Sequence, residues 1–563
     1  MRKFTAIALG AIVLGAIAVR LAPLWSFLYW GSDTAEYFSI LRNLVRTGHV
    51  STTYYGWGLT YPYFPGVFFP QTGLVELGGL DVPTVLNLLV PVIGAFAVVP
   101  MFLLAVRIAR DDRIGLFAAA FLAGAIPHAY TTAHAAPATL GDLLALTGLV
   151  LFLRLRTDRR AMTPLLLVSG ALVFTHHLSL YFFILMVLGA IVIRGLARPW
   201  RTDAESRRQV AFAVVLIGGT FAFWFGYATT FRELVLRDVD IQPWWLLFVG
   251  FAAGAAVLAG LIAARTRLAW RYRPAFPRLG ASAAACAAAL VTLFVIGVVT
   301  IISGVPGTSF RVPPAGLLYF VPLAILLSFS ASGRKFLDLD QEGIHPNAWL
   351  VALLLSAVVG IVWAPRVLIP YRHAEYLMIP FALFAGVGFF RLLDLGGLRA
   401  RRRYAALALC GGLLLANGLT GIPPPSTLAG WREGTIPAAL EPAYWARDHV
   451  SGLVVSDHHG SSTVFGFGGI NATWDRTRTP FTDPVWDPAD FSGIESPSGT
   501  KNGTYVWIDR DMEAGVRLLP WEAAAPMDSA VIEKFDNVPF IRVFDNGYAR
   551  IYWIAWGCTP TSC

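Results

Sequence analysis

Stretches of apolar residues long enough to cross a membrane recur along most of the 563-residue chain. A membrane-spanning helix needs about 20 mostly apolar residues. By this criterion we mark about thirteen spans, at 4–29, 84–106, 114–130, 138–153, 162–176, 178–193, 209–228, 244–264, 280–303, 314–331, 348–364, 375–391 and 403–421. Only 14% of the residues are charged, whereas a soluble protein contains about 25%. The sequence therefore predicts a polytopic α-helical protein of the cell membrane.

Clusters of basic residues between the spans predict the orientation. They are Arg2-Lys3, Arg107–Arg113, Arg154–Arg160, Arg194–Arg208, Arg265–Arg278, Arg334-Lys335 and Arg391–Arg403. Basic connections stay on the cytoplasmic side, so we expect a cytoplasmic N-terminus and an extracytoplasmic C-terminal part. In that compartment Cys558 and Cys563 are able to form a disulfide. The net charge of +9 comes mostly from these clusters, and we expect membrane lipids, not nucleic acid, as the partner.

The composition changes after the last span. Residues 1–421 are predicted to form a transmembrane domain with a first outer loop at 30–83. Residues 422–563 are predicted to form an extracytoplasmic α/β domain, joined through the stiff proline run 423–425. The expected strands lie at 453–456 and 505–508, and on either side of a hairpin turn of sequence Asp-Asn-Gly, at 540–544 and 549–556.

Two carboxylates stand at the start of the first outer loop. Asp33 and Glu36 are three positions apart, so a helix would place them on one face. Acids lodged against a membrane bundle mark a functional site, although both could instead cap the helix expected at 34–46. We expect that helix to lie in the membrane interface. The aromatic residues that follow fit either a sugar-stacking wall or an interfacial belt; they are Tyr54, Tyr55, Trp57 and Tyr61.

A second polar group is predicted at the same membrane face. Its members are His134, Asp142, His176, His177, Arg372, His373 and Glu375. Together with the first-loop acids, such a set could bind a divalent cation such as Mg²⁺ or Mn²⁺, an anionic phosphate, or both. Asp33, His134 and His177 are the candidate metal ligands.

Structural roles remain open for several of these side chains. His176 and His177 could form a satisfied interfacial pair, and Asp142 could cap the start of its helix. Arg372 could extend to lipid headgroups, as we expect Arg20 to do.

Two motifs resemble the GT-C superfamily of membrane glycosyltransferases, which use polyprenyl- or dolichyl-phosphate-linked sugars. They are Asp33-x-x-Glu36-Tyr37 in the first loop and Arg372-x-x-Glu375-Tyr-x-x-x-Pro380 before a late span. The architecture is similar to archaeal and bacterial oligosaccharyltransferase catalytic subunits. It also resembles archaeal membrane proteins with the segments found here at Thr175–Ser179 and Ser456–Asp475.

The resemblance implies a catalytic first-loop aspartate, Asp33, acting as base or as ligand for a metal and an acceptor amide, with Arg372 on the lipid phosphate. An oligosaccharyltransferase would carry a Trp-Trp-Asp-Tyr-Gly signature, where this chain has Val455-Ser-Asp-His-His459. The missing signature therefore argues against transfer to a protein asparagine, and we expect a glycan, a lipid or another protein side chain as the acceptor.

We accordingly expect sugar transfer from a polyprenyl or dolichyl (pyro)phosphate carrier. Asp33 and Glu36 are the candidate catalytic carboxylates. The candidate ligands of the donor phosphate are Arg372, His176, His177 and His373. The candidate acceptor or sugar contacts are Tyr54, Tyr55, Trp57, Tyr61 and Glu375. A flippase or transporter of lipid-linked glycans is the main alternative, although transporters often show internal repeats and none is visible. An inert membrane anchor with a surface-binding domain is the third possible function.

Overall fold

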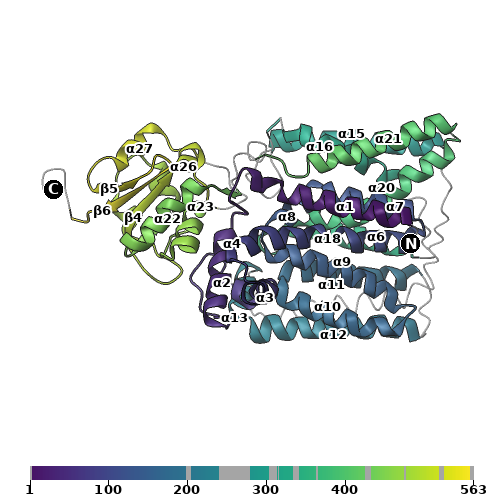
Figure 1. Ribbon diagram of the computed structural model, residues 1–563, viewed down its shortest axis with the longest axis horizontal. Helices are drawn as coiled ribbons and strands as arrows, with labels where there is room; N and C mark the ends of the chain where they lie inside the picture. Colours follow the sequence, from purple (N-terminus) through teal and green to yellow (C-terminus); the bar gives the residue numbers. More distant parts are fainter. Residues whose placement is uncertain are drawn as a thin grey trace.

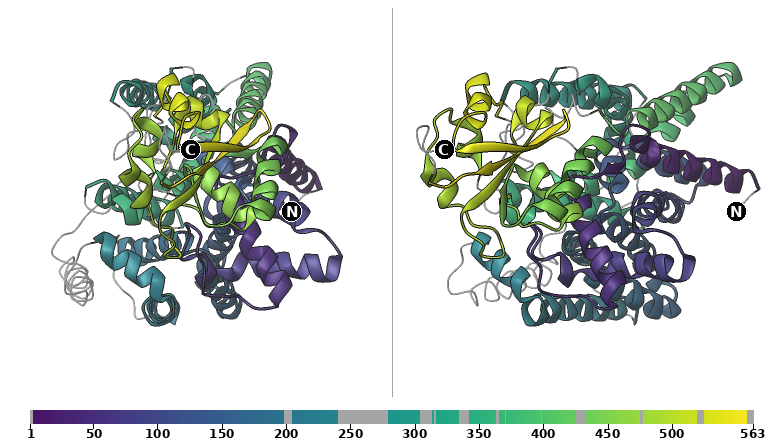
Figure 2. Two further views of the ribbon diagram at one scale, coloured as in Figure 1. Left: turned by 90° about the vertical axis from the view of Figure 1, so that its left-hand side faces the viewer. Right: turned by 60° about the vertical axis from the view of Figure 1, so that its left-hand side comes forward.

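A helical bundle and a smaller α/β domain make up the computed structural model (Figure 1). The structure describes residues 3–197, 204–239, 279–303, 313–314, 316–333, 342–362, 365–369, 371–397, 399–424, 433–474, 477–518 and 525–557. The predicted disulfide cysteines, Cys558 and Cys563, lie outside the described residues. The α/β domain covers one end of the bundle, and the N-terminus lies at the other end, as Figure 2 also shows.

The bundle contains most of the apolar spans. Its helices are α1 (Lys3–Leu21), α5 (Val90–Ala95), α6 (Val98–Ala109), α7 (Asp112–Gly124), α8 (Ile126–Ala133), α9 (Pro137–Leu155), α10 (Met162–Thr175), α11 (His177–Ala197), α12 (Ala204–Phe221), α15 (Leu279–Ser303), α16 (Gly316–Ser328), α17 (Ser330–Gly333), α18 (Ile344–Val362), α20 (Arg372–Leu395) and α21 (Ala400–Leu419). Within the described part of the chain, nine helical stretches are long and apolar enough to cross a membrane, and the bent pair α7–α8 makes a tenth. Twelve of the thirteen predicted spans contain a helix, and the span 244–264 lies outside the described residues. The protein is therefore a multi-pass membrane protein.

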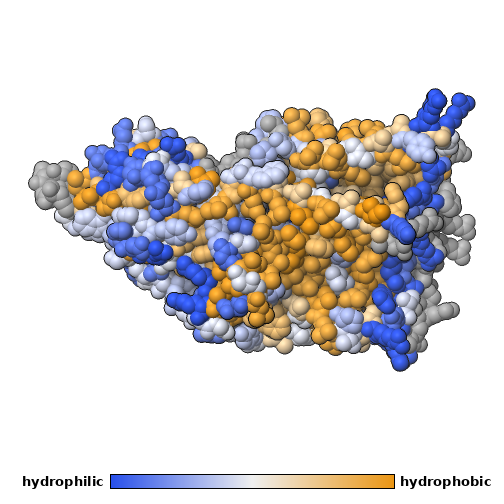
Figure 3. Space-filling view, in the orientation of Figure 1, coloured by the Kyte–Doolittle hydropathy of each residue, from blue (hydrophilic) through white to orange (hydrophobic). Residues whose placement is uncertain are grey.

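The surface of the bundle matches a bilayer environment. Apolar side chains cover its middle, and hydrophilic ones gather at the end remote from the α/β domain (Figure 3). Two of the predicted basic connections meet through Glu342, which lies 3.6 Å from Arg107 and 3.5 Å from Arg156. The basic end and the α/β domain thus lie at opposite ends, as the positive-inside rule predicts for a chain with an extracytoplasmic C-terminal part.

The break between α7 and α8 bends the pair by 60° and changes the expected role of Arg20. A helix end leaves backbone carbonyls without intrahelical partners. Arg20 reaches the carbonyl of Ala123 at 3.2 Å, the hydroxyl of Thr132 at 2.9 Å and the ring of His128 at 3.1 Å. Its side chain is buried, so the prediction that Arg20 extends to headgroups is wrong.

The first outer loop packs on the end of the bundle beneath the α/β domain. Its helices are α2 (Thr34–Thr47), α3 (Phe68–Gly78) and α4 (Val82–Thr84). The helix expected at 34–46 is present, with Arg42 and Arg46 exposed. Its apolar stripe, however, is buried within the protein, against a turn of the α/β domain (η10, Val464–Gly468) and against α3. The short helices α13 (Thr229–Val239) and α19 (Pro365–Leu368) lie in other connections.

The C-terminal domain is an α/β unit, as predicted. Its four-stranded sheet has the order β3-β4-β6-β5, formed by β3 (Leu453–Val455), β4 (Gly503–Asp509), β5 (Phe540–Asp545) and β6 (Ala549–Ile554). Strands β3 and β4 are parallel, whereas β6 is antiparallel to both of its neighbours. The helices are α22 (Pro437–His449), α23 (His458–Thr463), α24 (Arg478–Thr482), α25 (Pro488–Ser492), α26 (Arg510–Gly515) and α27 (Ser529–Phe535).

The junction between the two domains is closely packed. Strand β1 (Tyr29–Trp30), directly after the first span, pairs antiparallel with β2 (Gly434–Thr435), directly before α22. Apolar residues of the first loop and of the α/β domain share one hydrophobic core. At Gly466 a Cβ atom would overlap the backbone carbonyl of Ala35 in α2. The C-terminal domain therefore packs so closely on the first loop that no side chain fits at Gly466.

Candidate active site

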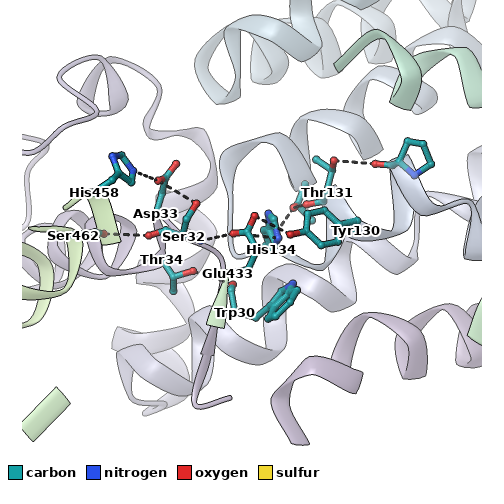
Figure 4. A network of polar contacts seen from close by, with 12 residues as sticks. Trp30, Ser32, Asp33, Thr34, Tyr130, Thr131, His134, Glu433, His458 and Ser462 are labelled. Atoms are coloured by element: carbon teal, nitrogen blue, oxygen red, sulfur yellow. Dashed lines mark hydrogen bonds and ion pairs between the residues drawn. The ribbon is translucent and has the colours of Figure 1, made fainter. Parts of the chain in front are cut away.

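Asp33 lies at the N-terminus of α2, where the first loop meets the α/β domain. Its carboxylate makes no capping hydrogen bond to α2 among the described residues. Instead Oδ2 accepts a hydrogen bond from the Tyr61 hydroxyl at 3.0 Å, and Oδ1 lies 3.5 Å from Nε2 of His458 (Figure 4). The side chain remains 23% exposed. Asp33 is thus held in place by side chains and is still open to an incoming group.

Glu36, one turn further along α2, has a different environment. It is fully buried. Its carboxyl oxygens accept hydrogen bonds from the Tyr54 hydroxyl at 3.0 Å, the Gly58 amide at 2.9 Å and the Trp57 amide at 3.2 Å. Glu36 therefore fixes the loop 54–58 to α2, and this loop places Trp57 against His458.

His458 comes from the start of α23 in the C-terminal domain. Its amide donates to the carbonyl of Arg517 at 2.9 Å, and its side chain is 2% exposed. The ring of Trp57 meets it edge-on at 5.0 Å between centroids, and that of Trp474 lies at 6.0 Å. The imidazole is therefore held between two indole rings, one from each domain.

Glu433, just before β2, binds the turn that precedes Asp33. Its Oε2 accepts a hydrogen bond from the Ser32 amide at 2.7 Å, and its Oε1 accepts one from the Tyr130 hydroxyl at 2.9 Å. Nε2 of His134 lies 3.7 Å from Oε2. Figure 4 shows Ser32 between the Asp33–His458 pair and the Glu433–His134 pair. We call Asp33, Tyr61, His458, Glu433 and His134 the junction cluster.

The charges of the junction cluster are interdependent. Burial by itself raises the pKa of Asp33, but the hydrogen bond and charge of His458 and the hydrogen bond of Tyr61 outweigh it and hold the pKa below its usual value. Burial lowers the pKa of His458, but Asp33 and Glu36 reverse this and raise it. For Glu36, burial and the charge of Asp33 raise the pKa to about 8. At neutral pH Asp33 is therefore ionised and Glu36 is mostly protonated.

Arg372 begins α20 at the same end of the bundle. Its Nη1 lies 3.3 Å from the Thr131 hydroxyl of α8 and 3.5 Å from Oε2 of Glu375, and its side chain is 25% exposed. The guanidinium also lies 5.9 Å from the centroid of the Tyr371 ring. Burial lowers the pKa of His134, and the charged groups of Glu433, Arg372 and Asp33 lie close enough to its ring to affect that pKa as well. His134 thus lies close to both of the residues on which the sequence prediction centred.

A second set of polar residues lies inside the bundle beneath Arg372. We call Asp142, His176, Ser179, Glu375 and Tyr376 the bundle cluster. Asp142 accepts hydrogen bonds from the Ser179 hydroxyl at 3.0 Å and from the Tyr376 hydroxyl. Nδ1 of His176 lies 2.8 Å from the Ser179 hydroxyl, and Glu375 lies against Asp142. The cluster ties α9, α11 and α20 together.

The other predicted site residues have separate surroundings. His177 packs against the rings of Phe64 and Phe231. His373 points into the bundle, where its Nε2 lies 2.8 Å from the Ser356 hydroxyl. Tyr55 is 48% exposed.

No group of three or more His, Cys, Asp or Glu side chains in the described ranges is arranged to hold a metal ion. Asp33, His134 and His177 do not form a ligand set, because His134 faces Glu433 and His177 lies among aromatic rings. A requirement for Mg²⁺ or Mn²⁺ stays a prediction, and no step below passes through a metal.

Sequence reasoning missed two members of the junction cluster. His458 lies in the segment that replaces the oligosaccharyltransferase signature, which was the available signal. Glu433 follows the proline-rich connection and carries no motif, so nothing in its sequence surroundings indicates its role.

No protein-family model and no curated protein sequence matches the chain. Its structure is similar to that of ArnT from Cupriavidus metallidurans bound to undecaprenyl phosphate, with a TM-score of 0.51 and 12% sequence identity over 98% of each chain. It is also similar to arabinofuranosyltransferase AftD from Mycobacteria, with a TM-score of 0.53 and 16% identity over 100% of this chain and 40% of that chain. At such identities the likeness concerns the fold.

Proposed function

Because the chain has the GT-C fold, we propose that it is a membrane glycosyltransferase that takes its sugar from a polyprenyl-phosphate carrier. The observation that carries the proposal is the setting of Asp33. Among Glu36 and the carboxylates of the two clusters it is the one with appreciable exposure, at 23%, against 7% for Glu433, 4% for Glu375, 3% for Asp142 and full burial for Glu36. It is also ionised, and an ionised, accessible carboxylate is suited to act as a general base.

Arg372 supplies the complementary charge. A phosphate leaving group develops negative charge as the glycosidic bond breaks, and guanidinium N–H groups stabilise such charge. The Arg372 side chain is 25% exposed, and Tyr130 and Thr131 place α8 between Arg372 and Glu433. The neighbour ArnT was solved with undecaprenyl phosphate, which supports a lipid-phosphate donor for this chain.

The proposed reaction is a single displacement. The acceptor oxygen forms a bond to the anomeric carbon while the bond from that carbon to the phosphate oxygen breaks, and the electron pair of the broken bond goes to the phosphate. The acceptor proton passes to the Asp33 carboxylate. The transition state has oxocarbenium character, and Arg372 balances the charge of the departing phosphate. Glu36 holds the aromatic loop in position and is not proposed to touch the substrate.

The acceptor side of the site lies at the domain junction. Tyr61 donates a hydrogen bond to Asp33, and Trp57 packs against His458 next to it; aromatic faces stack well on sugar rings. Glycan, lipid and protein acceptors all remain within the proposal, as do the dolichyl carrier and the pyrophosphate form of the donor. By the positive-inside pattern we place this face outside the cytoplasm.

The test is transfer by purified full-length protein in lipid nanodiscs supplied with radiolabelled polyprenyl-phosphate sugars. Asp33→Asn should lower turnover by about 10²- to 10⁴-fold, the usual contribution of a general base, and should retain the binding of undecaprenyl phosphate. Asp81→Asn is the matched control, because this first-loop acid is exposed and only caps α4. Wild-type protein that consumes no donor, or Asp33→Asn with wild-type turnover, would contradict the proposal.

A further inference from the structure

Two residues of the junction cluster, Glu433 and His458, come from the C-terminal domain, and His458 is the one that lies beside Asp33. We propose that His458 is the positioning residue for Asp33, so that glycosyl transfer requires the docked C-terminal domain as well as the membrane bundle. This inference rests on the proposed function. It gives the extracytoplasmic domain a direct part in the reaction, beyond acceptor binding or anchoring.

The first support is that His458 is placed independently of Asp33. Its backbone is fixed by the hydrogen bond to Arg517, and the preceding Asp457 accepts hydrogen bonds from the amides of Gly460 at 2.9 Å and Arg517 at 3.3 Å. The indole rings of Trp57 and Trp474 then limit rotation of the imidazole. A group held by its own surroundings is preorganised, and preorganised charge costs no rearrangement during the reaction.

The second support is the precision of the docking. Ser462, one turn beyond His458 in α23, donates a hydrogen bond to the carbonyl of Ser32 at 3.2 Å. At Gly466 there is no room for a side chain against α2. Two contacts on the same segment therefore fix the distance between α23 and the start of α2, which is the distance that sets the 3.5 Å separation of His458 and Asp33.

The third support is the balance of charge around the imidazole. The acids that face it are Asp33 and Glu36 from the first loop and Asp457 from its own segment. Burial and the charge of Asp509 raise the pKa of Asp457 to about 7, and that of Glu36 is about 8, so Asp33 is the most readily ionised of the three. A protonated His458 therefore has Asp33 as its main counter-ion, and His134 approaches Asp33 from the opposite side.

In this role His458 takes no proton from the acceptor. It keeps Asp33 ionised between turnovers and holds Oδ1, while Tyr61 holds Oδ2. Oδ1 also accepts a hydrogen bond from the Ser32 hydroxyl at 3.5 Å. Oδ2 still has a lone pair for the acceptor hydroxyl, because each carboxylate oxygen offers about two acceptor positions. Loss of His458 should thus make Asp33 harder to ionise and leave its carboxylate less well oriented toward the acceptor. Donor binding at Arg372 should be unchanged.

The experiment has two arms on full-length protein in nanodiscs. In the first, kcat, KM and the pH profile of transfer are measured for wild type, His458→Gln and His458→Lys. We expect His458→Gln to lower kcat by about 10- to 100-fold, as for other supporting residues, with little change in donor KM. Its acidic limb should move to higher pH, because Asp33 loses a cation, and His458→Lys should move it back. His449→Gln is the control, since that exposed histidine only contacts Trp445.

The second arm does not depend on turnover or on folding of a His458 variant. Titration of ¹⁵N-labelled histidines should show His458 losing its proton at lower pH in Asp33→Asn than in wild type. An unchanged His458 titration in Asp33→Asn, or an unchanged kcat and acidic limb in His458→Gln, would overturn the proposal and leave the proposed function intact. Wild-type protein without transfer would overturn both.

Discussion

The junction cluster and the bundle cluster are built from the same kinds of side chain, but they differ in how far their carboxylates are exposed. In the bundle cluster, Asp142 receives two hydroxyl hydrogen bonds and is 3% exposed. In the junction cluster, Asp33 is 23% exposed and pairs with a histidine from another domain. A buried network between helices holds them together, whereas a partly exposed carboxylate can be reached by a substrate.

The two clusters also differ in how they are assembled. The members of the bundle cluster all lie on or next to membrane helices, so its geometry follows from the membrane domain alone. The junction cluster exists only when the first loop, the residues before β2 and α23 come together. We therefore expect changes in the bundle cluster to act mainly on stability, and changes at the junction to act mainly on transfer.

The largest effect should come from separating the domains. Gly466→Val would drive a side chain into the backbone of α2, and overpacking of this kind costs about 1–3 kcal/mol or more. We expect transfer to fall by at least the amount lost in His458→Gln, and the connection before β2 to become sensitive to protease. Gly218→Val is the control, because its Cβ would meet open space. Full transfer by Gly466→Val would show that docking is dispensable.

Removing the Glu36 carboxyl should have the second largest effect. Glu36→Ala leaves the Tyr54 hydroxyl and the amides of Trp57 and Gly58 without their acceptor, at about 1–3 kcal/mol for each buried group left unsatisfied. Thermal unfolding should register this loss. Glu36→Gln keeps a neutral acceptor and should be milder. Equal loss of transfer in Glu36→Gln and Asp33→Asn, without loss of stability, would instead make Glu36 a catalytic group.

Tyr376→Phe tests the opposite side of the comparison. It removes one hydrogen bond to Asp142 and leaves the Phe182 stacking partner in place. A buried acceptor that loses a donor costs about 1–3 kcal/mol, which should appear as a lower unfolding temperature with transfer reduced less than tenfold. A loss of transfer like that of Asp33→Asn, at unchanged stability, would place chemistry in the bundle cluster.

The junction should also show a distinct pH dependence. The pKa of Asp33 is lowered by folding, so its contribution to stability is lost as the pH falls below about 3.9, its unfolded value. The pKa of His458 is raised, so its contribution is full below about 6.5 and is lost at higher pH. Glu36, with a pKa of about 8, becomes costly to bury as the pH rises from about 4.3. Domain docking, measured by protease protection, should thus be strongest near about pH 4 and weaken as the pH rises. Glu36→Gln should flatten this decline between about pH 4.3 and 8.

His373→Gln should have the smallest effect. His373 was predicted to bind the donor phosphate, but its ring lies against Phe182 and Ser356 inside the bundle. Donor affinity should change less than threefold, about the size of a surface substitution of 0.5 kcal/mol. Arg372→Gln, by contrast, is expected to lose donor binding. An equal loss of donor binding in His373→Gln would show that His373 also binds the donor phosphate.

The sequence predicted those features that depend on local pattern. Apolar length located the spans, alternation and the Asp-Asn-Gly turn located the hairpin, and topology placed Asp33 and Arg372 at one end. The sequence also predicted helix α2, but not that the C-terminal domain covers its apolar stripe. An amphipathic helix has the same sequence pattern whether lipid or protein covers its apolar face. The burial of Arg20 was missed because it follows from the break between α7 and α8.

The pairings at the junction could not be predicted for a simpler reason. Asp33 and His458 are 425 positions apart, and no local pattern connects them. Glu36 and Asp33 were given the same role because a helix places them on one face. The structure separates them by their partners, since backbone amides of the loop 54–58 surround Glu36 while side chains surround Asp33.

The pairing of β1 with β2 has a consequence for biosynthesis. Trp30 emerges early from the ribosome, but its partner Gly434 follows 404 positions later. At about 5–20 residues per second, the first loop waits roughly 20–80 s for that strand. A chain truncated before this point retains most of its membrane helices and lacks both Glu433 and His458. We expect such incomplete products to be inserted in the membrane and to lack a complete junction cluster.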